Sequence, residues 1–449
     1  MYTRTTMHLH RTLPFLLIAL AAPLAAERWV IAAERYEIEG RSRPEAIQAR
    51  IGNPVGQVFE TREDLDAFVA DRERRLTNLR VFKKSAVRAE ESVSQEENED
   101  IPITLVVTIE DSSSLALIPY AFYNSNEGFM AGVLANAPNL AGTLQRLTVT
   151  GLYSAPPNED DTLRWTDPNY VLVVAWGGPR FGPATVGSSF SLSRMRVRVR
   201  ERGIEGLRYE ATTVSGSVSA KIDIADSLAY TATARASYAP RHEILWVENQ
   251  DLLVQGPLIT SWSIENSIQF DRVDWVGNFR KGFLASLSAT ASRIDPAEAA
   301  PRVEISGKGE LAVFPVATRR LNPSARLVAF GKTGEPNLQA ASAVRGVRNA
   351  ELMANLSVAA NLSLQIFVAR VRSAEIHLIP AIDGIWAYAQ EAPDYRHDWG
   401  IGAGADLVVV FDAMRSLPVK LGFAMDLRPY DRLGEGKRYE IDFGFRFTY

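Results

Sequence analysis

Over the last three quarters of the chain, hydrophobic residues recur at every second position. In "VSGSVSAKIDI", Ile222 and Ile224 share one parity and Lys221 and Asp223 the other, and "YTATARASY", "SWSIENSIQF" and "PVKLGFAMDL" alternate in the same way. Successive side chains of a strand point to opposite faces, so each segment has one apolar and one polar face. Many such strands in series can satisfy each other's backbone hydrogen bonds.

A water-soluble β-sandwich also alternates, but its connections are short. Here long polar, Pro-rich or acidic connections such as "APPNEDDTLRWTDP" and "QEAPDYRHD" separate the strands, and aromatic residues lie near strand ends, as in an interfacial girdle. A composition of 46% hydrophobic and 23% charged residues is no objection, because alternation averages to neutral hydropathy. We therefore predict a transmembrane antiparallel β-barrel over residues 113–449.

The number of strands follows from the same pattern. Roughly fifteen can be placed from Asn126 onward, and single-chain bacterial barrels have an even number, so we predict about 16. The first strand is expected at Asn126–Ala135 and the last at Arg438–Tyr449, with the unplaced strand expected in "RHEILWVENQ". An interpretation as a soluble periplasmic β protein remains the alternative.

The first 26 residues have the pattern of a secretory signal peptide. Arg4 and Arg11 precede an apolar core at Leu13–Ala22, and the small residues Ala25 and Ala26 offer a cleavage site. A single membrane anchor would need a longer apolar run. The chain has no cysteine, which excludes a lipoprotein anchor and disulfides and suits a bacterial envelope protein. A net charge of -4 argues against nucleic acid as a partner.

Residues 27–112 predict a small α+β module. A strand "RYEIEG" precedes a helix in "SRPEAIQARIG", which has Pro44 in its first turn and Gly52 after its end. A second helix in "ETREDLDAFVADRERRLTNLRVF" begins with a capping box of Thr61 and Asp64. Two strands follow, "VFKKSAVRAE" and "PITLVVTIED". The acidic run "ESVSQEENED" between them is either a docking surface or, as we favour, a solvated loop.

Enzyme signatures fail on inspection. "GIGAGADL" lacks the helix and third glycine of a dinucleotide fingerprint, and "FGKTGEP" has Arg326 in place of the first glycine of a phosphate loop. We interpret the first as small residues on a crowded strand and the second as a turn after a strand. His242, His377 and His397 are scattered, so we expect no metal site and no cofactor.

The segment "RMRVRVRER" places five arginines, from Arg194 to Arg202, on one parity. In a barrel they either line the lumen or lie on a strand extension in water beyond the membrane. Phe190 and Leu192 precede them on the same parity, which predicts a bulge or turn near Ser193.

The segment "AVRGVRNAE" lies in a long connection with room for about five strands after it. This arrangement resembles the BamA-like and two-partner-secretion transporter superfamily, bacterial surface antigen type. There, a loop with "VRGF" or "VRGY" folds back into the barrel and its arginine pairs with an acid on the inner wall. The match covers Val344, Arg345 and Gly346, with Val347 in place of the aromatic residue. The resemblance implies Asp383 in "PAIDGIW" as the partner of Arg345, and Asp406 is the alternative.

The carboxyl-terminal segment "RYEIDFGFRFTY" has aromatic and aliphatic residues on one parity and polar residues on the other, which predicts a strand with one face toward lipid and one toward the lumen. Asp442, Gly444, Phe447 and Tyr449 resemble the terminal signal by which the outer-membrane assembly machinery recognises barrels of this family.

The resemblance extends to the rest of the chain. The module resembles a single POTRA domain, and "SLALIPYAFYNSNEGFMAGV" resembles the family's entry from this module into the barrel. The expected location is the bacterial outer membrane with the module in the periplasm. The implied function is insertion or translocation of client polypeptides, with outer-membrane lipid and the assembly machinery as further partners. A passive pore or structural barrel without clients is the alternative.

Overall fold

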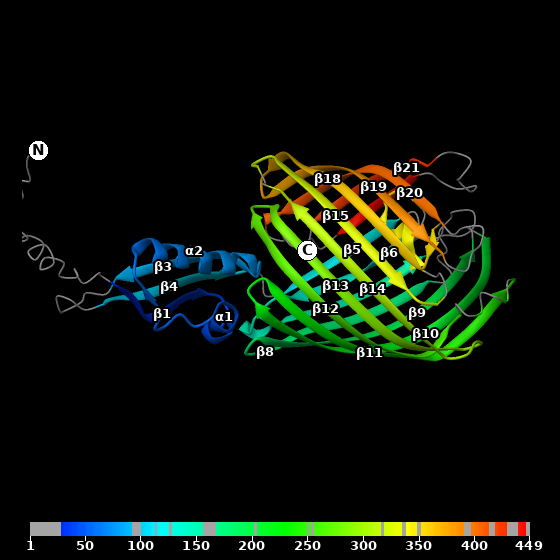
Figure 1. Cartoon of the computed structure of the whole chain (residues 1–449), viewed down its shortest axis with the longest axis horizontal. Coiled ribbons are helices and arrows are strands. Elements are labelled where there is room, and N and C mark those ends of the chain that lie inside the picture. The colour runs from blue at the N-terminus through cyan, green and yellow to red at the C-terminus, as the bar shows by residue number, and fades with distance from the viewer. Residues whose placement is uncertain are drawn as a thin grey trace, which may run out of the picture.

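The computed structural model shows a small domain at one end of a barrel (Figure 1). It describes residues 28–91, 100–112, 115–124, 128–155, 168–201, 204–248, 250, 253, 256–315, 318–334, 338–347, 352–389, 397–412, 418–428 and 439–445. The predicted signal peptide lies outside these ranges, as do most of the acidic run, most of the connections at 155–168 and 390–398, and Phe447 and Tyr449.

In the described residues, sixteen antiparallel strands close a barrel, which confirms the predicted fold and number. Each strand pairs with its neighbours in chain order, and β22 pairs with β5 to close the ring. The strands are β5 (Ala116–Asn124), β6 (Gly128–Ala137), β7 (Arg146–Ala155), β8 (Asn169–Phe181), β9 (Ala184–Glu201), β10 (Ile204–Ala225), β11 (Leu228–Val247), β12 (Leu258–Val276), β13 (Phe279–Pro296), β14 (Arg302–Phe314), β15 (Leu321–Lys332), β18 (Leu356–Val371), β19 (Ala374–Tyr388), β20 (Asp398–Phe411), β21 (Val419–Asp426) and β22 (Tyr439–Phe445).

Two of the expected strand positions are wrong. The first barrel strand is β5, not Asn126–Ala135, and the latter segment belongs largely to the second strand, β6. Pro119 conceals β5 in the sequence because proline is rare in strands except at edges. The segment "RHEILWVENQ" does not add a strand of its own, since its first seven residues extend β11 to Val247.

The expected bulge near Ser193 is also wrong. β9 pairs with β10 in continuous register from Ala184 to Val199, so Arg194 shares the outer face of Phe190 and Leu192. Arg194 forms an ion pair with Glu210 of β10 on that outer face, 2.8 Å apart. Within the described part of the stripe, lumen lining is therefore excluded in favour of a strand extension.

Alternation sorts the side chains of the barrel wall as predicted. Trp262 and Ile264 of β12 are 64% and 60% exposed on the outside, while Ser261 and Ser263 point inward. The outward residues of β22, Tyr439, Ile441 and Phe443, continue the apolar belt. Among the described helices, none has the length and hydropathy needed to span a membrane.

The amino-terminal domain is a four-stranded sheet in the order β2-β1-β4-β3, with two helices, which confirms the predicted small α+β fold. Its hydrophobic core joins both helices to the sheet and includes Ile47, Leu76 and Val107. Asp64 N–H donates to Thr61 Oγ1 over 3.1 Å at the predicted capping box. The elements are β1 (Trp29–Glu39), α1 (Pro44–Ile51), β2 (Val58–Phe59), α2 (Arg62–Asn78), β3 (Phe82–Glu91) and β4 (Ile101–Asp111).

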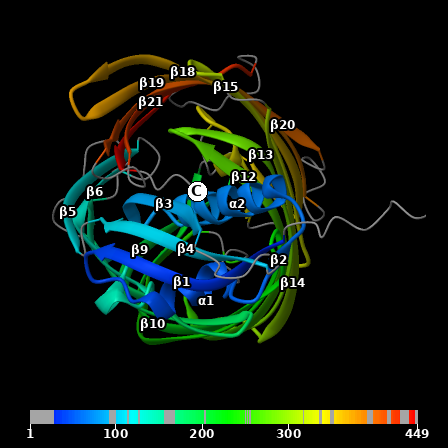
Figure 2. The ribbon, with the colours of Figure 1, turned by 90° about the vertical axis from the view of Figure 1, so that its left-hand side faces the viewer.

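The domain lies across the adjacent mouth of the barrel (Figure 2). Helix α2 reaches the barrel wall at two points: Arg75 pairs with Asp226 of the β10–β11 turn at 2.6 Å, and Arg74 pairs with Asp274 near the end of β12 at 3.0 Å. On the other side, Arg43 N–H donates to the carbonyl of Gly142 in the β6–β7 turn, 2.9 Å away. These contacts hold the domain at two separate places on the rim.

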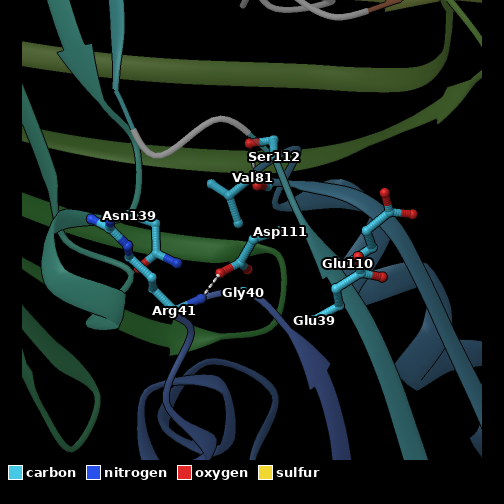
Figure 3. A pocket seen from close by; sticks show the side chains of 8 residues that line it. All are labelled: Glu39, Gly40, Arg41, Val81, Glu110, Asp111, Ser112 and Asn139. Carbon is cyan, nitrogen blue, oxygen red and sulfur yellow. Dashed lines mark hydrogen bonds between the residues drawn. The ribbon is translucent and has the colours of Figure 1, made fainter.

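A hollow of about 300 Å³ marks the junction between domain and barrel (Figure 3). Asp111, one of its lining residues, accepts hydrogen bonds from the backbone N–H groups of Arg41 (2.6 Å) and Ser42 (2.8 Å). Asn139 of the β6–β7 turn donates to Ser42 Oγ over 2.6 Å. The hollow is thus framed by the hydrogen bonds that join the two parts of the chain.

Candidate functional site

The connection between β15 and β18 folds back inside the barrel. Its ends pair as a short ribbon of β16 (Leu338–Gln339) and β17 (Met353–Ala354), and a 3-10 turn at Ala340–Ala343 lies between them. Small and aliphatic side chains of this inner loop pack on the wall of β18 and β19. The cluster comprises Ala340, Ala341, Val344, Val347, Leu352 and Ala354 of the loop with Ala359, Ile385 and Ala387 of the wall.

Arg345 extends from the tip of this loop toward two acids on the wall. Its Nε lies 3.3 Å from Asp383 Oδ2 on β19, and its Nη1 lies 3.5 Å from Asp406 Oδ2 on β20. The Arg345 N–H also donates to Asp383 Oδ2 over 3.1 Å. The Asp383 side chain is only 1% exposed, so an arginine beside it compensates a carboxylate that would otherwise be buried alone. The structure thus brings both acids considered from the sequence to the same arginine.

Gly346 fixes the backbone at the tip. Its φ of +78° is in the left-handed region, which glycine adopts without strain. A Cβ at this position would lie 2.5 Å from the backbone carbon of Met425 in β21. Gly346 N–H donates to Glu440 Oε2 of β22 over 2.9 Å. The loop therefore reaches the last strand as well as β19 and β20.

Gly402 on β20 provides the space for this approach. A Cβ there would lie 1.8 Å from the carbonyl oxygen of Arg345. This glycine belongs to "GIGAGADL", whose interpretation as small residues on a crowded strand is confirmed. Absence of a side chain on β20 is thus what allows the loop backbone to lie flat on the wall.

The ring closes at a seam between β22 and β5. Among the described residues, only Asp442 with Asn124 and Phe443 with Tyr123 pair across it. By comparison, β5 pairs with β6 through nine residue pairs and β21 with β22 through seven. Phe122 Cδ2 lies 2.5 Å from where a Cβ of Gly444 would be, so the predicted signal glycine leaves room for this ring.

The shape of the molecule matches solved outer-membrane proteins. CdiB from Acinetobacter baumannii aligns at 14% identity with a TM-score of 0.61, over 94% of this chain and 74% of that one. CdiB from Escherichia coli aligns at 15% with a TM-score of 0.60, over 92% and 76%. BamA from Haemophilus ducreyi lacking POTRA domains 1-3 aligns at 11% with a TM-score of 0.54, over 92% and 85%. The chain has the CdiB and BamA fold.

By sequence, no protein-family model and no curated protein matches the chain. At identities of 11–15%, similarity to CdiB and BamA concerns the arrangement of the backbone.

Sequence reasoning missed three side chains at this site. Lys420 Nζ on β21 lies 3.1 Å from Asp406 Oδ1 and 2.8 Å from Asp442 Oδ2. Glu440 receives the Gly346 N–H, and Asn361 Nδ2 donates to the carbonyl of Ala343 over 3.0 Å. Lys420 and Glu440 are on the polar parity of their strands, and this parity was the only sequence signal that they face the lumen. Their partners depend on register between strands, and a shift of two residues would leave the alternation of faces unchanged.

In the part of the chain that the structure describes, no group of three or more histidine, cysteine or acidic residues is arranged to hold a metal. His377 on β19 has its Nε2 3.3 Å from Glu375, and its ring lies edge-on to Phe279 and Phe367. We interpret this histidine as part of the packed inner wall.

Proposed function

We propose that the protein is an outer-membrane barrel that helps other polypeptides to insert into or cross the outer membrane, with its α+β domain in the periplasm. The observation that carries this proposal is the seam between β22 and β5. A strand with unpaired backbone groups can add a strand from another chain. The seam would offer such groups to a client polypeptide, and no covalent bond would be made or broken.

The inner loop supports the same function. It occupies the lumen side of β18–β20, where Asp383 and Ala359 are almost fully buried beneath it. A barrel with part of its lumen filled is suited to controlled passage rather than to free diffusion of solutes. The fold that the chain shares with CdiB and BamA is compatible with a transport function.

The α+β domain would receive clients before the barrel does. Among the described residues, β3 pairs with β4 alone among the strands, and its other edge would accept an added strand beyond Val87, whose N–H donates to Glu73 of α2. Lys83, Lys84 and Arg88 project from this edge strand and are more than half exposed. Charges on an edge limit uncontrolled pairing with other sheets while still permitting a selected strand.

A passive pore is the second candidate, and one observation favours it. On the wall of β9–β12, away from the inner loop, serine hydroxyls pair across strands, as in Ser191 with Ser215 and Ser237 with Ser261. A wall lined with small hydroxyl groups favours a hydrated passage. The size of that passage decides between a gated transporter and an open channel.

Depletion of the protein from its own cells tests the proposal. We expect the amounts of particular outer-membrane or secreted proteins to fall, as measured by quantitative proteomics of envelope and culture medium. In planar bilayers, the purified full-length protein should show low conductance with brief openings. Large, steady conductance together with an unchanged envelope would instead establish the passive pore.

A further inference from the structure

A chain of ionic contacts runs from the inner loop to the seam. Arg345 of the loop contacts Asp406 on β20, Asp406 contacts Lys420 on β21, and Lys420 contacts Asp442 on β22, at 3.5, 3.1 and 2.8 Å. The second and third steps each cross to the neighbouring strand. The last residue, Asp442, is one of the two described β22 residues that pair with β5.

These groups are shielded from solvent. The side chains of Lys420, Asp442 and Asp406 are 8%, 9% and 11% exposed. Salt screens buried charges much less than exposed ones, so the ammonium of Lys420 and its two carboxylates affect each other strongly. Removing one member of such a set leaves a buried charge without compensation.

The balance of charge depends on where the loop is. With Arg345 seated, the ion pairs among the described residues link Asp383 and Asp406 to Arg345, and Asp406 and Asp442 to Lys420. With the loop withdrawn, Asp383 and Asp406 lose the contact with Arg345. Asp406 then attracts the ammonium more strongly, and Asp442 at the seam is held less firmly.

We propose that Lys420 couples the position of the inner loop to the pairing of the seam. When the loop is seated, Lys420 holds Asp442 and β22 in register with β5, and when the loop withdraws, the seam opens more easily. Coupling between two sites is reciprocal, so opening the seam also loosens Arg345. The proposed function gives this coupling its purpose, but the coupling itself is a property of the isolated barrel. Lys420 acts here as a positioning residue.

The natural lack of cysteine makes the seam easy to trap. Tyr123 and Phe443 are directly opposite each other, and directly opposed residues on antiparallel strands are close enough for a disulfide. Full-length protein with Tyr123→Cys and Phe443→Cys, reconstituted in lipid vesicles, would be exposed briefly to a mild oxidant. The rate of disulfide formation, determined by mass spectrometry, measures how often the seam is closed.

Lys420→Gln in this background is expected to slow disulfide formation by about 3- to 10-fold, and Arg345→Gln should slow it as well. The two effects should combine to less than their product, because both changes act through Asp406. Lys420→Arg keeps the positive charge and should therefore form the disulfide at the parental rate. Lys332→Gln is the matched control, because Lys332 is equally buried and pairs with Glu304 at 3.1 Å in another part of the wall.

Asp442→Asn tests the same link from its other end if Lys420→Gln does not fold, which heat-dependent gel mobility would reveal. An unchanged trapping rate in folded Lys420→Gln, or strictly multiplicative effects of the changes at Arg345 and Lys420, would overturn the coupling. Because these measurements involve no client, their failure is distinct from a failure of the proposed function. If the coupling is absent but clients are still delivered, only the coupling fails. If the coupling is present but no client depends on the protein, only the proposed function fails.

Discussion

Arg345 on the inner loop and Asp383 on β19 form an ion pair across 38 residues of sequence, with Nε and Oδ2 3.3 Å apart. The same carboxylate oxygen accepts the Arg345 N–H, so both the side chain and the backbone of the loop tip are held by one acid. The loop tip is therefore fixed in direction as well as position.

Replacing Arg345 by Gln should destabilise the folded barrel by about 3 kcal/mol, because it leaves Asp383 buried without a cation. Unfolding by urea in detergent micelles would measure the change. Arg326→Gln is the control: Arg326 also pairs with an acid of the wall, Glu310, but is 46% exposed, so about 0–1 kcal/mol is expected. Adding Asp383→Asn to Arg345→Gln should recover part of the loss. Equal shifts for the two arginine variants would contradict this account.

Gly346→Ala should unseat the loop more than Gly334→Ala. Both glycines have a positive φ, +78° and +81°, so each alanine costs about 1 kcal/mol of backbone strain. Only at Gly346 would the new Cβ meet backbone atoms, 2.5 Å away in Met425, whereas near Gly334 it meets the end of Glu304 at 3.7 Å. Limited proteolysis of the folded protein should show faster cleavage of the inner loop in Gly346→Ala alone. Similar cleavage in both variants would mean that strain, not the close approach, dominates.

Helix α2 should lose stability at acid pH through Asp71. Burial by itself raises the pKa of Asp71, but hydrogen bonds from Arg74 and Arg75 outweigh it and hold the pKa below its usual value. A carboxyl group whose pKa is lower in the folded state stabilises the fold above its unfolded pKa, and this contribution is lost as the pH falls through the folded value. Hydrogen exchange of residues 62–78 in the full chain would measure this.

Asp71→Asn is the reference for that experiment. At neutral pH, α2 should be better protected from hydrogen exchange in the parent than in the variant, and in acid the two levels of protection should become equal. The two proteins are compared under identical conditions at each pH. A difference that stays constant down to the acid limit would show that the ionisation of Asp71 is not responsible.

Deleting Tyr449, or changing Phe447 to Ala, should lower the folded fraction of the protein in membranes several-fold more than Thr448→Ala. The first two changes affect the apolar parity and the resemblance to the terminal assembly signal, whereas Thr448 is on the polar parity. These three residues lie outside the described ranges, so the expectation rests on the sequence alone. Heat-dependent gel mobility of membrane fractions would quantify folded barrel. An equal loss in all three variants would argue against a specific signal.

The sequence by itself determined the class of fold and the orientation of most side chains. Period-two alternation distinguishes outer from inner residues because the pleat fixes side-chain direction locally, so Ile264 and Phe443 could be assigned to the outside without knowing their neighbours. Local signals likewise located α1 and α2, since Pro44 and the Thr61 capping box act within one helical turn. Local signals also failed at β5: Pro119 lowers the local strand propensity, so the first strand of the barrel, at the seam, was not recognised.

Only the tertiary structure decided which inner charges meet. Arg345 was placed in the lumen by resemblance, but its position between Asp383 and Asp406 depends on the stagger of β19 and β20 and on the missing side chain at Gly402. Lys420 and Asp442 are 22 residues apart and become partners because β21 and β22 pair in one particular register. Alternation repeats every two residues and specifies a face, whereas register and ring closure arise from the packing of the whole barrel.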